Sequence, residues 1–145
     1  MAIKAKKPES KADQKWTPGV GQHGYSMLPN ILFRYASDLR INASQQAVLL
    51  HLLAFWWDAD RPPEVSKEQL AKRLGISPRQ VQRHIKVLRK LGLIEVYEPN
   101  RPGRHPNQYR FEGLVKKLGK SAQAYRRQLK RQEYERGKAA RNGRT

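Results

Sequence analysis

Four cations recur on one side of a short amphipathic segment, residues 78–91. At 100° per residue, Arg79, Arg83, Lys86 and Lys90 fall within about 60° of one another. Guanidinium and ammonium groups donate hydrogen bonds and neutralise anions, so this face is suited to phosphates and to the acceptor atoms of bases. No acidic residue occurs in the segment, whereas a merely solvated helix face, the alternative interpretation, usually mixes both signs. The pattern indicates a surface that meets a polyanion.

The opposite side of this segment is apolar, and the two faces together suggest how it binds. Val81, Ile85 and Leu88 also fall within about 60° of one another and form a stripe that packs on a core. The major groove of duplex DNA is about 12 Å wide and admits one helix, whose N-terminal residues reach the base edges. Arginine pairs there with guanine, and glutamine with adenine. The predicted base-reading residues are Arg79, Gln80, Gln82 and Arg83.

Other cations are expected to contact the DNA backbone and the minor groove. The helix N-terminus offers backbone N–H groups to a phosphate. Arg101 and Arg104 lie between prolines in a downstream loop, and stiff arginine tips suit a narrow minor groove. The alternative is a basic loop that contacts nothing, and Tyr109 beyond it is expected to pack. The predicted backbone contacts are Lys67, Lys72, Arg73, Ser77, Lys86 and Lys90.

Two helices with matching start and stop signals position these residues. In "SKEQLAKRLG", Ser66 and Gln69 form a predicted capping box and Gly75 ends the helix. In "SPRQVQRHIKVLRKLG", Ser77 and Gln80 repeat the box, a proline occupies the first helical position, and a glycine follows the last. Two helices joined by so short a turn must cross at a large angle, which predicts a helix-turn-helix unit.

A two-stranded wing is predicted directly after this unit. The segments "LIEVYE" at 93–98 and "NQYRF" at 107–111 have the alternating character of short strands. The loop between them contains three prolines and one glycine, so we expect a stiff excursion and not a tight hairpin turn.

Two upstream helices are expected to complete the domain. The segment "SMLPNILFRYASDLR" predicts a short helix at about 30–39. Ser44 is the expected N-cap of the next helix, which is apolar on nearly every face from Ala47 to Trp57 and should be the buried central helix. Consecutive prolines in "DADRPPEV" end it. Adjacent Trp56 and Trp57 cannot both point into one core from one helix, so one could pack inside while the other covers a partner surface or the N-terminal arm. A core role for both is the default expectation.

The charge is distributed as a nearly neutral body with basic ends. The chain has 145 residues and a formal charge of +18, from 30 Lys and Arg against 12 Asp and Glu. Residues 25–78 hold six cations and five anions, whereas residues 112–145 hold eleven cations and three anions. Such an excess usually meets a polyanion. The predicted fold is mainly α with a small β-wing, divided into a flexible basic arm (1–24), a winged helix-turn-helix domain (25–111), and a basic C-terminal helix and tail (112–145).

The C-terminal segment predicts a basic helix at 112–136 with one apolar stripe. This stripe could pair with a second copy, which would make a homodimer that reads a two-fold DNA site. Alternatively, it could fold back on its own domain. The stripe consists of Leu114, Leu118, Ala122, Tyr125 and Leu129.

Several other kinds of chemistry are not expected. The chain has no cysteine, and its four histidines lack the spacing of a metal site. No phosphate loop, nucleophile motif or acid–base pair appears, so neither a cofactor nor an enzymatic activity is predicted. No apolar run approaches the roughly 18 residues that span a bilayer. The N-terminus has no apolar signal core, and the expected location is the bacterial cytoplasm, on the nucleoid when DNA is bound.

The segment "VSKEQLAKRLGISPRQVQRHIKVLRKLGLIEVY" resembles the winged helix-turn-helix of bacterial MarR-type and GntR-type regulators. It is more similar still to the helix-turn-helix modules of phage and plasmid replication proteins, whose lead-in resembles "MLPNILFR" and "LRINASQQAVLLHLLAFWW". The resemblance covers residues 25–111. It implies that residues 77–91 form the recognition helix, with Arg79, Gln80, Gln82 and Arg83 at the usual base-reading positions.

The sequence therefore predicts sequence-specific binding of double-stranded DNA, most simply by a transcriptional regulator of a mobile element such as a phage or plasmid. A replication-initiation or partition protein is the nearest alternative. An RNA-binding or ribosome-associated protein is another, because both tails are basic. A protein-interaction adaptor that uses Trp56 and Trp57 is a third.

Overall fold

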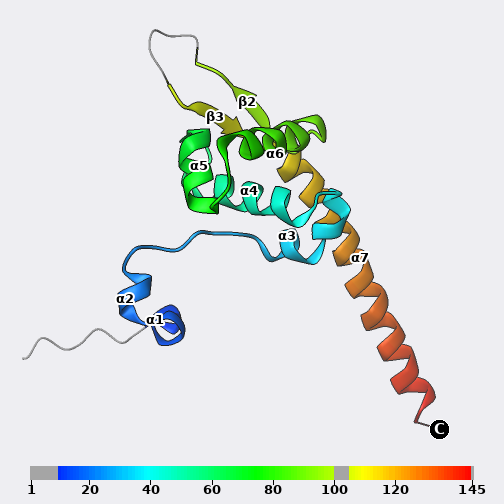
Figure 1. Cartoon of the computed structure of the whole chain (residues 1–145). Coiled ribbons are helices and arrows are strands. Elements are labelled where there is room, and N and C mark those ends of the chain that lie inside the picture. The colour runs from blue at the N-terminus through cyan, green and yellow to red at the C-terminus, as the bar shows by residue number, and fades with distance from the viewer. Residues whose placement is uncertain (1–9, 100–104, 145) are drawn as a thin grey trace, which may run out of the picture.

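The computed structural model describes residues 10–99 and 105–144. Two short helices, α1 (Lys11–Trp16) and α2 (Pro18–Gly21), lie within the segment predicted as an arm, and neither buries a residue. They pack against each other apart from the domain, to which residues 22–29 connect them (Figure 1). This segment therefore adds nothing to the core, and its mobility stays a prediction.

The helix expected at 30–39 is present as two shorter pieces. The α-helix α3 spans Asn30–Arg34, and the 3-10 helix η1 spans Ala36–Leu39. Between them Tyr35 adopts φ −113° and ψ 26°, outside the α-helical range, so the α-helix cannot continue through it. The break leaves both Leu32 and Leu39 fully buried.

The central helix α4 (Ala43–Ala54) starts two residues before the predicted position. Asn42, not Ser44, is its N-cap: the Asn42 side-chain oxygen accepts from the Gln45 backbone N–H at 2.9 Å. The Gln45 side-chain oxygen accepts from the Asn42 N–H at 2.9 Å, which completes a capping box. As predicted, this helix is buried, through Val48, Leu49, Leu52 and Leu53.

The helix-turn-helix unit is formed by α5 (Lys67–Leu74) and α6 (Pro78–Lys90). Ser66 caps α5 by accepting from the Gln69 N–H at 3.0 Å; of the predicted box only this half is present. Gly75 ends α5 at φ +67°, a left-handed conformation that favours glycine, and so allows the three-residue turn. Both helices pack on α4 to form a three-helix body (Figure 1).

The wing is part of a three-stranded antiparallel sheet with the order β1-β3-β2. The two predicted strands are β2 (Glu95–Tyr97) and β3 (Asn107–Arg110). The third, β1 (Glu64–Val65), immediately precedes α5 and was not predicted. The Gln108 side-chain amide donates to the Glu64 carboxylate at 2.6 Å across this additional pair.

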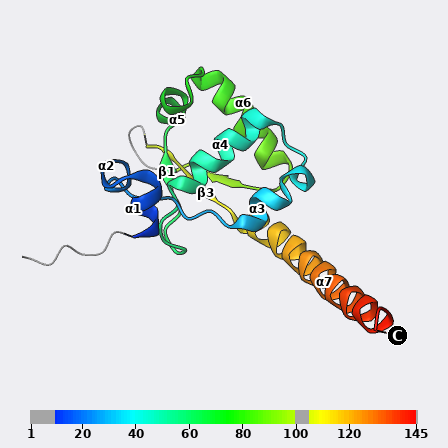
Figure 2. The ribbon, with the colours of Figure 1, turned by 90° about the horizontal axis from the view of Figure 1, so that it is seen from below.

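The C-terminal helix α7 (Glu112–Asn142) is longer than predicted and projects from the domain (Figures 1 and 2). Leu114 and Leu118 at its base are buried in the core. About two turns beyond Leu118, Tyr125 lies edge-on to Tyr35, with 6.3 Å between the ring centroids. The Arg34 guanidinium stacks on the Tyr125 ring at 4.4 Å. Three of the five stripe residues therefore pack on the chain's own domain.

Candidate nucleic-acid interface

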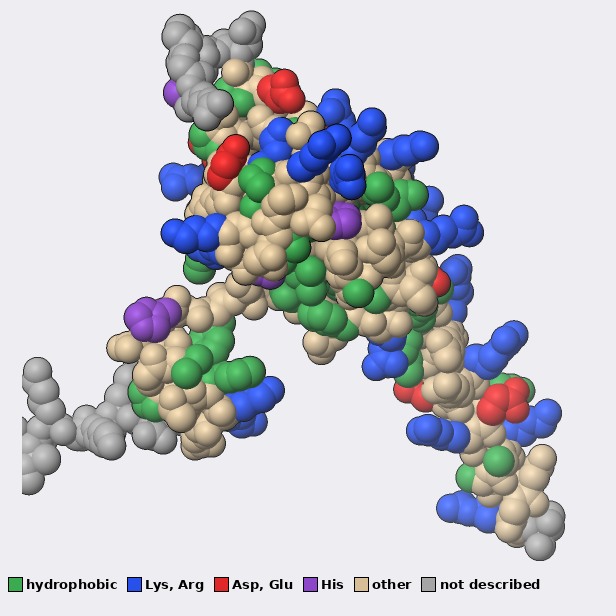
Figure 3. Space-filling view, in the orientation of Figure 1, with side chains coloured by type: hydrophobic (Ala, Val, Ile, Leu, Met, Phe, Trp, Pro, Cys, Tyr) green, Lys and Arg blue, Asp and Glu red, His purple; other side chains and the backbone are tan. Residues whose placement is uncertain are grey.

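The two faces of α6 differ as the sequence predicts. Val81 and Leu88 are 0 % exposed and Ile85 is 7 % exposed, so the apolar stripe is buried. The predicted outward residues Arg79, Arg83, Lys86 and Lys90 are all exposed. Basic side chains gather over the end of the domain that carries α6 (Figure 3). Because these side chains are exposed, their charge is available to an anionic partner.

The N-terminus of α6 is fixed by a complete capping box. The Ser77 hydroxyl accepts from the Gln80 backbone N–H at 3.2 Å, and the Gln80 side-chain oxygen accepts from the Ser77 N–H at 2.9 Å and from its hydroxyl at 3.2 Å. The side-chain oxygen of Gln80 is therefore already used within the protein. Of the four predicted base-reading residues, Gln80 is the one whose side chain serves the helix terminus.

Replacement of Ser77 by alanine is expected to cost about 1 kcal/mol of unfolding free energy, because it leaves the Gln80 N–H without its acceptor. Chemical denaturation measures this loss. Gln82→Ala is the matched control: Gln82 is exposed one turn further along α6 and makes no capping bond, and its replacement should leave stability within about 0.5 kcal/mol. Equal stability of Ser77→Ala and the parent would contradict the role of the cap.

A groove of about 280 Å³ separates α6 from one face of the wing. Gln82, Lys86 and Arg89 line its α6 side, and Lys67 at the start of α5 also lines it. Arg89 was not among the predicted site residues, because it lies at the edge of the basic face beside Ile85. Its position on the helical wheel could have revealed it, but only once the side of α6 that faces the wing was known. The wing side consists of Val96, Glu98, Asn107 and Tyr109.

The other predicted backbone contacts lie in different surroundings. Lys67 is half-buried at the groove, and Lys72 is exposed on α5. The Arg73 guanidinium stacks on the Phe55 ring at 4.5 Å, so in the free protein this cation is held against the domain. Arg101 and Arg104 lie outside the described residues.

Tyr109 packs in the interior, as expected, and is 0 % exposed. It lies opposite Val96 in the register of β2 and β3, on the face of the wing that meets α6. Burial raises the pKa of the Tyr109 phenol to about 12, and the nearby Asn107 side chain offsets only part of the rise. No described residue makes a well-formed hydrogen bond to its hydroxyl.

The raised pKa of Tyr109 predicts a loss of stability in strong alkali. Folding favours the protonated phenol, so this contribution is complete below the unfolded pKa of about 10 and is lost as the pH rises towards 12. Between about pH 9 and pH 11.5 the parent should lose roughly 2 kcal/mol more unfolding free energy than Tyr109→Phe, which cannot ionise. Denaturant titrations at both pH values measure the difference. Parallel losses in the two proteins would rule out the burial effect.

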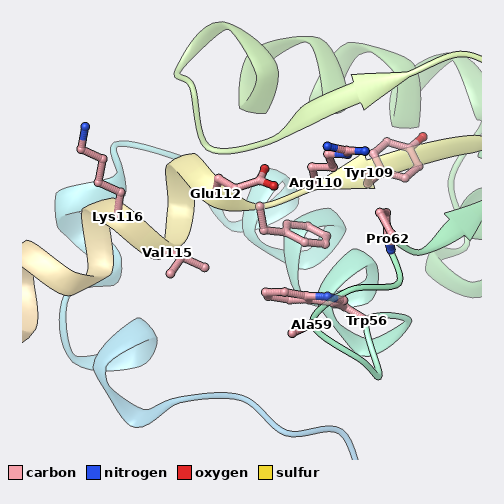
Figure 4. Close-up of a pocket in the computed structure, with 9 residues that line it drawn as sticks. Trp56, Ala59, Pro62, Tyr109, Arg110, Glu112, Val115 and Lys116 are labelled. Atoms are coloured by element: carbon pink, nitrogen blue, oxygen red, sulfur yellow. The ribbon is translucent and has the colours of Figure 1, made fainter.

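A second hollow, of about 360 Å³, lies where β3 ends and α7 begins. Trp56 forms part of its wall and packs on Phe111 with 5.1 Å between ring centroids. Figure 4 shows Val115 below the ribbon of α7, and Lys116 directed away from Trp56. Trp57 is 73 % exposed and Trp56 packs against the core, so the expected core role for both tryptophans is wrong.

The α4–α6 body, the short turn and the sheet together define a winged helix-turn-helix domain, a class that places its second helix in the major groove of DNA. Residues 39–94 match the family model of the helix-turn-helix domain. The match starts at the end of η1 and ends just before β2, so the strands β2 and β3 and the helix α7 lie beyond it.

Among solved structures, the chain is similar to a possible transcriptional regulator from Methanosarcina mazei Go1, with 18% identity, a TM-score of 0.43, and 73% of this chain and 85% of the other covered. It is also similar to S. aureus MepR in a complex with DNA, with 15% identity, a TM-score of 0.45, and coverage of 77% and 86%. A third similar structure is the transcriptional regulator PA3341, with 19% identity, a TM-score of 0.41, and coverage of 79% of this chain and 89% of the other. No curated protein matches the sequence.

The described residues hold no candidate for two other kinds of site. No group of three or more His, Asp or Glu side chains is placed to hold a metal ion in residues 10–99 and 105–144. Within the same ranges, no helix has both the length and the apolar character to cross a membrane.

Proposed function

We propose that this protein binds double-stranded DNA in a sequence-dependent manner through α6 and the wing, and that it regulates transcription. The observation that carries the proposal is the pairing of a buried apolar stripe with an exposed, acid-free basic face on the second helix of a helix-turn-helix. The proposed base-reading residues are Arg79, Gln82 and Arg83. Gln80 would join them only if DNA displaced the hydrogen bonds from Ser77 to its side-chain oxygen. Lys67, Lys72, Arg73, Lys86 and Lys90, together with Arg89, are the proposed phosphate contacts, and Ser77 would add one at the helix terminus.

Selection of bound duplexes from random DNA tests this function. A recovered consensus of several base pairs is expected, and half-site symmetry in it would indicate two copies on one site. Recovery of random sequences would overturn sequence-dependent binding. Placing the consensus before a reporter gene then tests regulation, and placing it beside a replication origin tests the replication alternative. A phage or plasmid setting stays a prediction.

Binding should weaken steeply with salt. If about six cations contact phosphates in one copy, the slope of log affinity against log salt should be near −5. Fluorescence anisotropy from roughly 50 to 200 mM salt measures this slope. A slope near zero would remove the electrostatic basis of the proposal.

Self-association through α7 also stays a prediction. Of the apolar stripe, Leu114, Leu118 and Tyr125 pack on the chain's own domain, whereas Ala122 is exposed and Leu129 is 40 % exposed. Sedimentation of the parent and of Leu129→Gln, with and without the selected duplex, tests whether the remaining stripe supports a dimer.

A further inference from the structure

The outer part of α7 is a basic rod with an exposed surface. All seventeen residues from 126 to 142 are exposed. Seven of them are Lys or Arg and two are Glu, a net charge of +5. At 1.5 Å per residue this part extends for about 25 Å. An isolated helix that places like charges four residues apart, as Arg126 and Lys130 do, is destabilised by their repulsion. An anionic partner would remove that repulsion.

The cations are gathered on one side of the helix. At 100° per residue, eight of them fall within about 140° of arc, and Glu133 and Glu135 fall outside it. This arc lies opposite the side occupied by Leu114, Leu118 and Tyr125, which pack on the domain. We call it the basic ridge: Lys116, Lys120, Arg126, Arg127, Lys130, Arg131, Lys138 and Arg141.

The basic ridge and the exposed face of α6 lie in different parts of the molecule. Figures 1 and 2 both show α7 leaving the domain, with its C-terminal half far from α6 and the wing. Figure 3 shows one gathering of basic side chains over the α6 end of the domain and a second along α7. A straight duplex seated on α6 therefore does not run along the outer part of α7.

We propose that the basic ridge binds a second segment of duplex DNA, so that one chain holds two segments at once. Duplex DNA carries one negative charge per about 1.7 Å, which complements a row of cations along a rod. A second copy is a poorer partner, because two basic ridges repel each other. A membrane surface is also poorer, because a helix that lies on a membrane needs a continuous exposed apolar face, and the large apolar side chains exposed on the outer part of α7, Leu129 and Tyr134, lie on different sides of the helix.

A capture assay tests this proposal, which rests on the proposed binding of DNA by α6. The full-length protein is bound to an immobilised duplex that carries the selected sequence, or any duplex if selection yields none, and a labelled second duplex is added. The test variant carries Arg126→Gln, Arg127→Gln, Lys130→Gln and Arg131→Gln, which keep good helix formers in place. The matched control carries Arg126→Lys, Arg127→Lys, Lys130→Arg and Arg131→Lys, which keep the charge. Circular dichroism checks the helix content of both.

The expected result is that the glutamine variant captures the second duplex at least about tenfold less than the parent, while the charge-keeping control captures it normally. Loss of four phosphate contacts should also reduce the salt slope of total binding by about 3–4. If no separate duplex is captured, footprinting on one long duplex is the second measurement. A footprint that extends beyond the α6 site in the parent and shortens in the glutamine variant would show that the second segment is a bent continuation of the same duplex.

Other outcomes would overturn the proposal. They are equal capture and equal footprints for the parent and the glutamine variant, or displacement of the labelled duplex by structured RNA at equal concentration. Capture that persists in the glutamine variant and follows dimer formation in sedimentation would assign bridging to a second copy. Failure of the proposed function is separable, because an Arg79→Ala and Arg83→Ala protein would lose sequence preference and still show binding that depends on the ridge.

Discussion

Replacing Arg79 and Arg83 together by alanine is expected to raise the Kd for the selected duplex by about 100-fold and to erase most of its preference over random DNA. Each arginine that pairs with a base is worth roughly 1–3 kcal/mol, and 1.4 kcal/mol is a factor of ten in Kd. Both side chains are exposed, on the first two turns of α6. The expected loss is therefore one of recognition, with the fold intact.

The matched control for this prediction is the double variant Lys86→Ala and Lys90→Ala. It removes the same charge from the same helix, but at positions expected to meet phosphates. It should weaken binding to selected and random duplexes by a similar factor and reduce the salt slope by about 2. Titration of the parent and the two double variants against the selected and the random duplex gives, for each protein, the ratio of the two Kd values. If the two double variants reduce sequence preference equally, Arg79 and Arg83 do not read bases.

Replacing Gly113 by alanine is expected to lower the unfolding free energy by about 2–3 kcal/mol. A Cβ atom at this position would overlap the backbone carbonyl oxygen of Gly92, at the turn between α6 and β2. The neighbouring Leu114 N–H donates to the Leu93 carbonyl at 3.2 Å, which ties the start of α7 to this turn. Because the obstacle is backbone, relief requires α7 or the turn to move, and overpacking of this kind typically costs about 1–3 kcal/mol.

Gly119→Ala is the matched control for this stability prediction. Gly119 lies nearly two turns further along the same helix, and a Cβ atom added there would meet nothing within 4 Å. Its replacement should raise stability by up to about 1 kcal/mol, because alanine favours a helix interior. Thermal denaturation of both variants measures the contrast. A Gly113→Ala protein as stable as the Gly119→Ala protein would mean that α7 does not pack tightly on the turn.

The parts of the fold that depend on local signals could be predicted from the sequence. Ser77 and Gln80 cap α6, Gly75 stops α5, and β2 and β3 lie within the predicted strands, because each signal and its effect are within a few residues. The N-cap of α4 was predicted wrongly for a related reason. Asn42 and Ser44 are both good caps, and the choice between them depends on Gln45, which completes a box only with Asn42.

The parts that depend on distant pairing could not be predicted. β1 consists of only Glu64 and Val65, and these become a strand because β3 passes beside them more than forty residues later. In the candidate site, too, the locally determined part could be predicted and the part that depends on distant packing could not. The exposed face of α6 follows from helical periodicity, whereas the groove against the wing, and with it Arg89, follows from how the sheet packs on α6.

A single residue, Phe111, separates the end of β3 from the start of α7, and its side chain is buried against Trp56. Because the connection is one buried residue, we expect α7 to keep a fixed orientation relative to the wing. A DNA segment bound by α7 would consequently lie at a fixed angle to the segment bound by α6. On one DNA molecule, that would favour sites separated by whole turns, about 10.5 base pairs or a multiple of this.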